Sequence, residues 1–376
     1  MRRPWPCRGP SWRRSCRKRW LPSVRSWQKL YARVRGGSVA SVARNTENAF
    51  RRPPRDLPTL PAIFGGRGES AGAVAVVKRA ALVAGGIVGG LGLAGAATFV
   101  YANQIELKAF RLKRVRVPAL PAGHRPLRIL HVSDFHMTRS QRKKQRWVAG
   151  LDALEPDLVV NTGDNLGGTD AVPAVLTALG PLLNRPGVFV FGTNDYFGPK
   201  PVNPFRYLTG KKRRPSAEKL PWEGMRAAFI ERGWSDATHR RLEFVAGGVR
   251  LAVTGVDDPH HGLDDYDSVT GAPNADADLA IGLSHSPEPR VLDRFADDGY
   301  DLVLCGHTHG GQVCLPFERA IVTNCGIDRA RASGLSRWTE RMWLHVSNGL
   351  GTSPYAPVRL FCPPSATLIE VVARES

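Results

Sequence analysis

Residues 127–136 read LRILHVSDFH and join a short apolar run to an aspartate and a histidine. Short apolar runs that end in Gly, Asp or Asn are typical of buried strands followed by a turn. The same arrangement recurs four times along the chain, at LVVNTGD (158–164), VFVFGTND (188–195), LAIGLSH (279–285) and LVLCGHTH (302–309). The sequence therefore predicts an α/β fold with polar side chains at the ends of its strands.

Polar side chains at the carboxyl ends of neighbouring strands meet at one edge of a sheet, where open α/β sheets place their sites. Seven nitrogen or oxygen ligands gathered there are too many for one ion, so we expect two divalent transition-metal ions. Ligand sets without thiolates suit Mn, Fe or Zn. Asp164 is the natural bridge, because a carboxylate has an oxygen for each ion. The candidate ligands are Asp134, His136, Asp164, Asn194, His285, His307 and His309.

Joined in this order, the motifs resemble those of the calcineurin-like metallophosphoesterases, which carry D-x-H, G-D, G-N-H-[DE], H and G-H-x-H. The resemblance covers residues 125–373, and GHTHGGQ (306–312) and NGLGTS (348–353) are similar to the bacterial membrane-associated branch. It implies a four-layer α/β/β/α sandwich that hydrolyses a phosphate ester or pyrophosphate with a metal-activated water. It also implies that Asp134, His136 and His309 hold one ion and that His285 and His307 hold the other, with Asp164 between them.

The third motif departs from the family, because residues 192–195 read GTND. Aligned without a gap, Thr193 takes the place of the ligand asparagine, and Asn194 that of the histidine that protonates the leaving group. A shift by one residue would instead make Asn194 a metal ligand. In both alignments the usual general acid is missing, and His345 is a candidate substitute or simply a packed strand histidine. The alternative function is therefore a metal-binding regulatory or binding protein with little turnover.

Each motif taken alone is also typical of an ordinary turn or a packed core histidine. Their common order and their placement at strand ends favour the metal site. Asp257 and Asp258, after another strand-like run, can touch substrate, orient a ligand histidine, or simply form a turn with Pro259.

Residues 1–79 hold 19 of the 53 basic residues and only 3 of the 33 acidic ones, so the high isoelectric point belongs to this leader. A segment rich in Arg, Pro, Trp and Ser without apolar periodicity is expected to be disordered. Its charge can attract anionic lipid or nucleic acid, of which nucleic acid is the less expected partner. The leader can also be untranslated, with a start near Val76 or Val77.

Residues 80–102 contain no charged side chain and match the roughly 20 residues that span a bilayer. They predict a transmembrane anchor, or alternatively a cleaved signal segment. With the basic leader inside, the domain at 125–373 lies outside the cytoplasm, although the basic linker at 103–124 opposes that orientation. A basic insertion at 196–221 is either a solvated surface loop or a loop that receives an anionic substrate, such as a phosphate-containing small molecule or a lipid-linked one.

Overall fold

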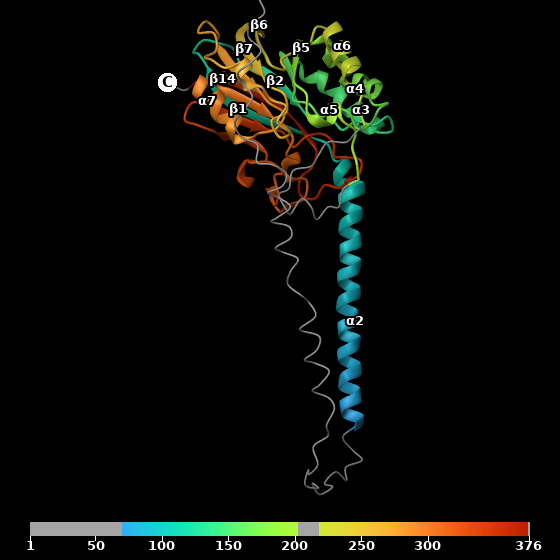
Figure 1. Ribbon diagram of the computed structural model, residues 1–376. Coiled ribbons are helices and arrows are strands. Elements are labelled where there is room, and N and C mark those ends of the chain that lie inside the picture. Colours follow the sequence, from blue (N-terminus) through green and yellow to red (C-terminus); the bar gives the residue numbers. More distant parts are fainter. Residues whose placement is uncertain (1–69, 202–217, 375–376) are drawn as a thin grey trace, which may run out of the picture. The chain divides into compact units, whose positions relative to one another are not determined.

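The computed structural model describes residues 70–201 and 218–374, and the chain divides into two units at Lys78 and Arg79. Residues 1–69 of the predicted leader and most of the basic insertion lie outside the described residues. The predictions of disorder and of an insertion that receives the substrate are therefore not addressed by the structure. The unit that begins at Arg79 holds two mixed six-stranded sheets (Figure 1).

The first sheet has the strand order β1-β14-β2-β3-β4-β5. Strands β2, β3, β4 and β5 run parallel, whereas β14 runs antiparallel to β2 and parallel to β1. Its strands are β1 (Arg111–Leu120), β2 (Leu127–Val132), β3 (Leu158–Asn161), β4 (Gly187–Phe189), β5 (Ser235–Asp236) and β14 (Ser365–Ala373).

The second sheet has the order β12-β13-β9-β8-β7-β6 and is parallel from β13 to β7, with an antiparallel strand at each edge. Its strands are β6 (Arg240–Ala246), β7 (Val249–Gly255), β8 (Leu279–Leu283), β9 (Leu302–Cys305), β12 (Gly334–Arg337) and β13 (Trp343–Val346). A separate hairpin pairs β10 (Cys314–Leu315) with β11 (Arg319–Ala320).

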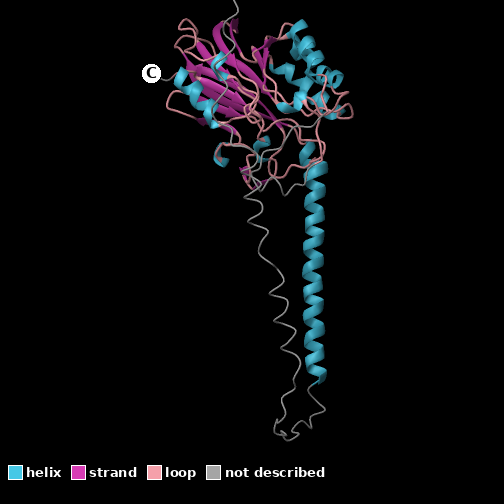
Figure 2. Ribbon diagram, in the orientation of Figure 1, coloured by secondary structure: helices cyan, strands magenta, loops and turns pink. Residues whose placement is uncertain are grey.

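Three apolar clusters follow from the alternation of side chains along these strands. One cluster joins both sheets, with Ile129 and Val160 of the first packed among Val253 and Ile281 of the second. Another packs the first sheet against α3 (Arg142–Ala149), α4 (Val172–Leu179) and α6 (Trp222–Glu231). The third packs the second sheet against α7 (Pro289–Asp298). Figure 2 shows the strands with helices on either side of them.

The apolar runs read from the sequence are confirmed as strands β2, β3, β4, β8 and β9. The expectation that all the polar side chains meet at the edge of one sheet is wrong, because β8 and β9 belong to the second sheet. Periodicity within a strand does not show which strand it pairs with. The site therefore lies where the ends of strands from two sheets come together.

Part of the segment expected to be a basic linker, 103–124, is strand β1 of the first sheet. Exposed Arg114 and Arg116 alternate with half-buried Val115 and buried Val117, as in a strand with one solvent-exposed face. The density of Lys and Arg in this segment concealed that alternation.

Helix α2 (Ser70–Val100) continues through a π-helical turn (Tyr101–Ile105) and a 3₁₀ turn (Glu106–Lys108). By length and composition, the stretch Lys78–Lys108 is able to cross a membrane, and none of its most apolar window is buried by protein. A signal segment near the N-terminus would pass the same test, so both alternatives of the prediction stay open.

Gly187 gives a test of how the first sheet packs. A Cβ atom at this position would lie 2.2 Å from Cε2 of the buried Trp234 ring. Gly187→Ala should therefore lower the free energy of unfolding by about 1–3 kcal/mol, as overpacking does. Denaturant unfolding of the detergent-solubilised chain measures the change.

Gly224 is the matched control, because a Cβ there meets nothing within 4 Å in helix α6. Gly224→Ala should stabilise the chain by about 0.5–1 kcal/mol through its helix propensity. A Gly187→Ala variant as stable as the parent chain would contradict the packing described.

Candidate metal centre

The candidate ligands lie in the turns directly after five strands. Asp134 and His136 follow β2, and Asp164 follows β3. Asn194 lies in α5 (Thr193–Tyr196) just after β4, while His285, His307 and His309 follow β8 and β9 of the second sheet. The fold thus brings together all seven residues that the sequence predicted, although they come from two sheets.

The backbone at these turns is held in the left-handed region, which residues other than glycine rarely adopt. Such conformations cost on the order of 1–3 kcal/mol each and gather at functional sites. Five of the candidate ligands have them: Asp134 (φ 51°), His136 (φ 39°), Asp164 (φ 56°), His307 (φ 69°) and His309 (φ 51°). Five of the seven candidate ligands are thus held in a strained backbone.

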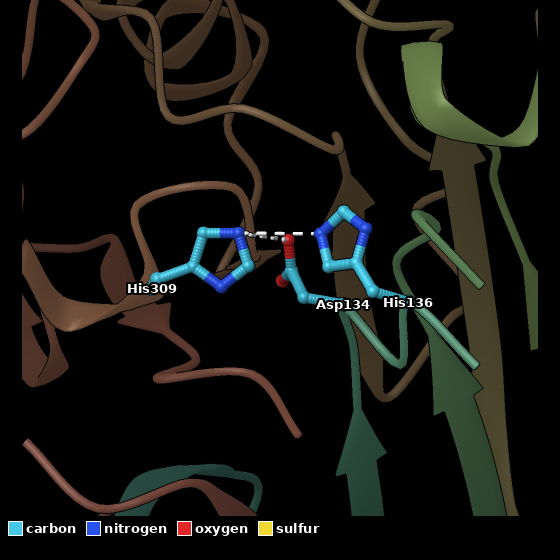
Figure 3. A group of neighbouring side chains, drawn as sticks. All are labelled: Asp134, His136 and His309. Atoms are coloured by element: carbon cyan, nitrogen blue, oxygen red, sulfur yellow. Dashed lines mark hydrogen bonds and ion pairs between the residues drawn. The ribbon is translucent and has the colours of Figure 1, made fainter. Parts of the chain in front are cut away.

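Asp134, His136 and His309 form one possible metal-holding group, with ligand atoms all within 4.8 Å of one another. His309 Nε2 lies 3.7 Å from Asp134 Oδ1, and the His136 and His309 rings stack with their centroids 5.1 Å apart. Figure 3 shows the Asp134 carboxylate between nitrogens of both imidazoles. These are the three residues expected to share one ion.

Asp134, Asp164 and His285 form a second such group. Asp164 Oδ2 lies 3.3 Å from His285 Nε2 and 3.6 Å from His136 Nε2, so this oxygen faces histidines of both groups. Asp134 is a member of both groups, which the sequence did not predict. The assignment of Asp164 as the bridging ligand stays a prediction.

His307 stands beside the second group without belonging to it. Its ring centroid is 5.3 Å from that of His285 and 4.5 Å from that of His260. Nε2 of His307 and Nε2 of His285 are both buried and have no hydrogen-bond partner. Because His285 Nδ1 donates to the Thr162 carbonyl at 2.7 Å, Nε2 is the nitrogen with which His285 would bind a metal ion. Two buried imidazole nitrogens without partners fit a metal ion.

The histidine pKa values favour the neutral rings that metal binding needs. Burial lowers the pKa of His136 to about 4 and that of His307 to about 3, the latter with help from nearby His260. Burial also holds the pKa of His309 well below its usual value. All three rings are therefore neutral near pH 7.

The two buried carboxylates behave differently. Burial raises the pKa of Asp134 to about 6. Burial would also raise the pKa of Asp164, but the charge of neighbouring His285 holds it below the usual value. In return Asp164 holds the pKa of His285 well above its usual value, against the effect of burial. Without metal, a protonated His285 would thus compensate Asp164, and metal binding would displace its Nε2 proton.

The GTND motif places its two central side chains apart. Asn194 donates to both oxygens of Asp164, with its backbone N–H at 2.9 Å and its side-chain Nδ2 at 2.6 Å. Thr193 instead donates from Oγ1 to Asp258 at 2.6 Å. Asn194 is therefore the residue of this motif that contacts the candidate metal ligands. Asp195 accepts from the backbone of Asp164 at 2.7 Å and so fixes that turn.

Sequence reasoning missed His260 and His261, although they follow Asp257 and Asp258 with only Pro259 between them. His261 Nδ1 lies 2.9 Å from Thr193 Oγ1, and His260 Nδ1 lies 3.1 Å from Glu288. Their position just after the β7 turn was the available signal. The possible orienting role of Asp258 acts on Thr193 and His261, not on a candidate ligand.

Two buried cations were also missed. Arg359 is fully buried and donates to the backbone oxygens of Asn348 and Gly351 at 2.7 Å, and Gly351 O also lies 3.1 Å from His309 Nδ1. Lys144, whose pKa burial lowers to about 7, donates to the carbonyl of Phe135 between two candidate ligands. Nothing in the sequence near either residue marks it as buried.

His345, the candidate substitute acid, lies on β13 with its Nδ1 2.9 Å from Nδ1 of His131. It is fully enclosed, at 1% exposure, and the cavity at the metal ligands does not reach it. The reading as a packed strand histidine therefore fits the structure.

A cavity of about 360 Å³ opens beside the candidate ligands. Its polar lining includes His136, Asp164, Asn194, His261, His307 and His309. Its apolar lining includes Phe197, Val313, Ile321, Val322, Ala356 and Val358. The ligand cluster therefore borders a space that a small molecule can enter.

Comparison with known proteins agrees with this geometry. The family model for calcineurin-like phosphoesterases matches residues 127–311. Phosphodiesterase YaeI of Escherichia coli is 26% identical over 287 residues, which cover 74% of this chain and 95% of that protein. The uncharacterized metallophosphoesterase YkuE of Bacillus subtilis is 26% identical over 77% of this chain and 92% of its own length. A transmembrane protein with metallophosphoesterase domain from Bos taurus is 28% identical over 69% of this chain and 56% of its own length. The chain therefore carries a calcineurin-like phosphoesterase domain over residues 127–311.

Proposed function

We propose that this chain is a hydrolase that cleaves a phosphate ester or pyrophosphate at a centre of two divalent metal ions. The observation that carries the proposal is the convergence of three strained turns on two groups of ligands, together with two buried imidazole nitrogens that make no hydrogen bond. Structural histidines and aspartates in a core normally have partners.

In this proposal Asp134, His136 and His309 hold one ion, and His285 and His307 hold the other, with Asp164 between them. Mn, Fe or Zn held there would activate a water near neutral pH and would bind phosphate oxygens. The chain's own groups fix the ligands. The Thr162 carbonyl orients His285 by accepting a hydrogen bond from its Nδ1–H. The Gly351 carbonyl lies in position to do the same for His309.

We further propose that the domain is a four-layer α/β/β/α sandwich. The apolar cluster shared by both sheets, flanked by one cluster under α3, α4 and α6 and another under α7, supports this layering. The ligands then lie at the end of the sandwich where the two sheets meet.

The domain is also proposed to sit on a membrane anchor formed by α2, with its catalytic face outside the cytoplasm. The apolar stretch Lys78–Lys108 and the transmembrane relative from Bos taurus support the anchor, and the basic leader supports the orientation. A phosphate-containing small molecule and a lipid-linked phosphoester both remain candidate substrates.

The altered third motif favours a second candidate, a metal-binding regulatory protein with little turnover. Hydrolysis of bis-p-nitrophenyl phosphate by the full chain with Mn²⁺ separates the two. Mn²⁺-dependent turnover that disappears with a chelator supports the hydrolase, whereas bound metal without turnover supports the binding protein.

Replacing Asp164 tests the metal assignment. Asp164→Ala should lower the content of both ions, because it removes the carboxylate that faces histidines of both groups. Elemental analysis of the purified full chain gives the metal content. Asp170→Ala is the control, since Asp170 is an exposed carboxylate, at 63% side-chain exposure. Two ions per chain still tightly bound in Asp164→Ala would refute the assignment.

Replacing Asn194 tests the third motif. If Asn194 occupies the position of the family's general acid, the chain lacks a strong proton donor, a loss that typically costs about 10²–10⁴-fold in rate. The loss matters little for leaving groups that are already weak bases. The chain should then favour aryl esters or pyrophosphates, and Asn194→His should raise the kcat for alkyl esters.

Asn194→Ala is the matched control, because it removes the contact with Asp164 without adding an imidazole. If Asn194 is instead a ligand, both substitutions should change the binding of one ion. Unchanged metal content together with an unchanged dependence on the leaving group would contradict both assignments.

A further inference from the structure

Exposed large apolar side chains outside helix α2 are concentrated in one region. Among the described residues after Ile105, nine large apolar side chains are exposed, and six of these fall in residues 313–321 and 355–361. Single exposed apolar residues need no explanation, whereas a contiguous patch usually marks an interaction surface. We call these six the apolar collar: Val313, Leu315, Phe317, Ile321, Tyr355 and Phe361.

The collar is one surface, because its two segments are hydrogen-bonded to each other. Val313 forms a β-bridge with Leu360, and the Cys314 N–H donates to the Leu360 carbonyl at 2.9 Å. The side chain of Gln312 also donates to the carbonyl of Ala356 at 3.0 Å. Leu315 lies in the β10–β11 hairpin, and Phe317 is in its loop.

Two phenylalanines of the collar are held outward by an unfavourable backbone. Phe317 has a φ of 68° and is 92% exposed, and Phe361 has a φ of 53° and is 44% exposed. A bulky residue in the left-handed region is uncommon, and the exposed Phe317 ring gains little packing within the chain in return. An apolar partner outside the chain would supply that packing.

The collar is joined to the residues that directly follow helix α2. The Arg359 N–H donates to the Ala102 carbonyl at 3.2 Å, and the Asn103 side chain donates to the Pro357 carbonyl at 2.5 Å. The N–H of Cys362 donates to Glu106 at 2.6 Å. The collar therefore starts within a few residues of the end of the apolar helix.

The charges around the collar suit a bilayer surface. Lys108, Arg111 and Arg319 are exposed beside it, whereas Glu318 is paired with Lys113 at 2.5 Å. Basic side chains near an apolar surface are attracted by anionic headgroups, and aromatic side chains are enriched at the level of those headgroups.

We propose that the apolar collar lies in the headgroup region of the bilayer that α2 spans, and that the metal-site cavity opens there. Val313 and Ile321 belong both to the collar and to the cavity wall, so the cavity is continuous with this surface. A phosphoester whose apolar part rests in the bilayer can then reach the ligands without leaving the membrane. The inference rests on the proposed anchor but not on turnover.

Photocrosslinking of the full chain in vesicles of phosphatidylethanolamine and phosphatidylglycerol tests the proposal. p-Benzoylphenylalanine replaces Phe317 or Tyr355, which are too exposed for the substitution to disturb the core. Phe99 in α2 is the positive control, and Val245, exposed at 63% on β6, is the matched negative control. The measured quantity is the yield of covalent lipid adduct at each position.

We expect lipid adducts at 317, 355 and 99, with a yield at 245 several-fold lower than at 317. Adducts at 99 but none at 317 or 355 would overturn the proposal, while leaving the anchor and the hydrolase intact. Protein crosslinks at 317 in place of lipid would overturn it in favour of a protein partner. No adduct at 99 would overturn both the anchor and the collar.

Discussion

The arrangement of the domain depends on two buried carboxylates, Asp134 and Asp164. The basic side chains that face them are imidazoles rather than Lys or Arg. Bringing a charge out of water is expensive unless a partner compensates it. Here the neighbours are imidazoles, of which burial keeps His136, His307 and His309 neutral, so that only His285 carries compensating charge. Metal cations at this position would satisfy both carboxylates and the two histidine nitrogens that lack partners. The need to neutralise these two buried carboxylates therefore connects the packing of the core with the proposed metal binding.

The candidate ligands lie in the segments that follow the strands rather than in the strands themselves. Turns with a left-handed backbone after β2, β3 and β9 orient the ligand side chains. These turns are held by hydrogen bonds from residues that do not line the cavity. Asp195 fixes the turn at Asp164, and Lys144 fixes the turn between Asp134 and His136. Arg359 fixes the carbonyls behind His309 and also bonds to the segment that follows α2. A substitution of Asp195, Lys144 or Arg359 should therefore change the geometry of the candidate ligands, although none of the three is itself a candidate ligand.

The sequence predicted the strand runs and the set of residues at the site because both depend on local pattern. Period-two apolar runs and the turn residues that close them are visible in a single chain, and they placed Asp134, Asp164 and His285 correctly at strand ends. Strand pairing depends on contacts between distant segments, so the division into two sheets and the role of β1 were not visible. Arg359 and His260 were missed for the same reason. Their importance comes from burial and from partners far along the chain, such as His309 for Arg359 and His307 for His260.

The central claim, two ions held by one cluster of ligands, is tested most directly by electron paramagnetic resonance of the full chain loaded with Mn²⁺. The account predicts two Mn²⁺ per chain and a spin-coupled spectrum, because ions that share a carboxylate lie roughly 3.5–4 Å apart. A single Mn²⁺ per chain with the spectrum of an isolated ion, unchanged at saturating metal, would contradict it.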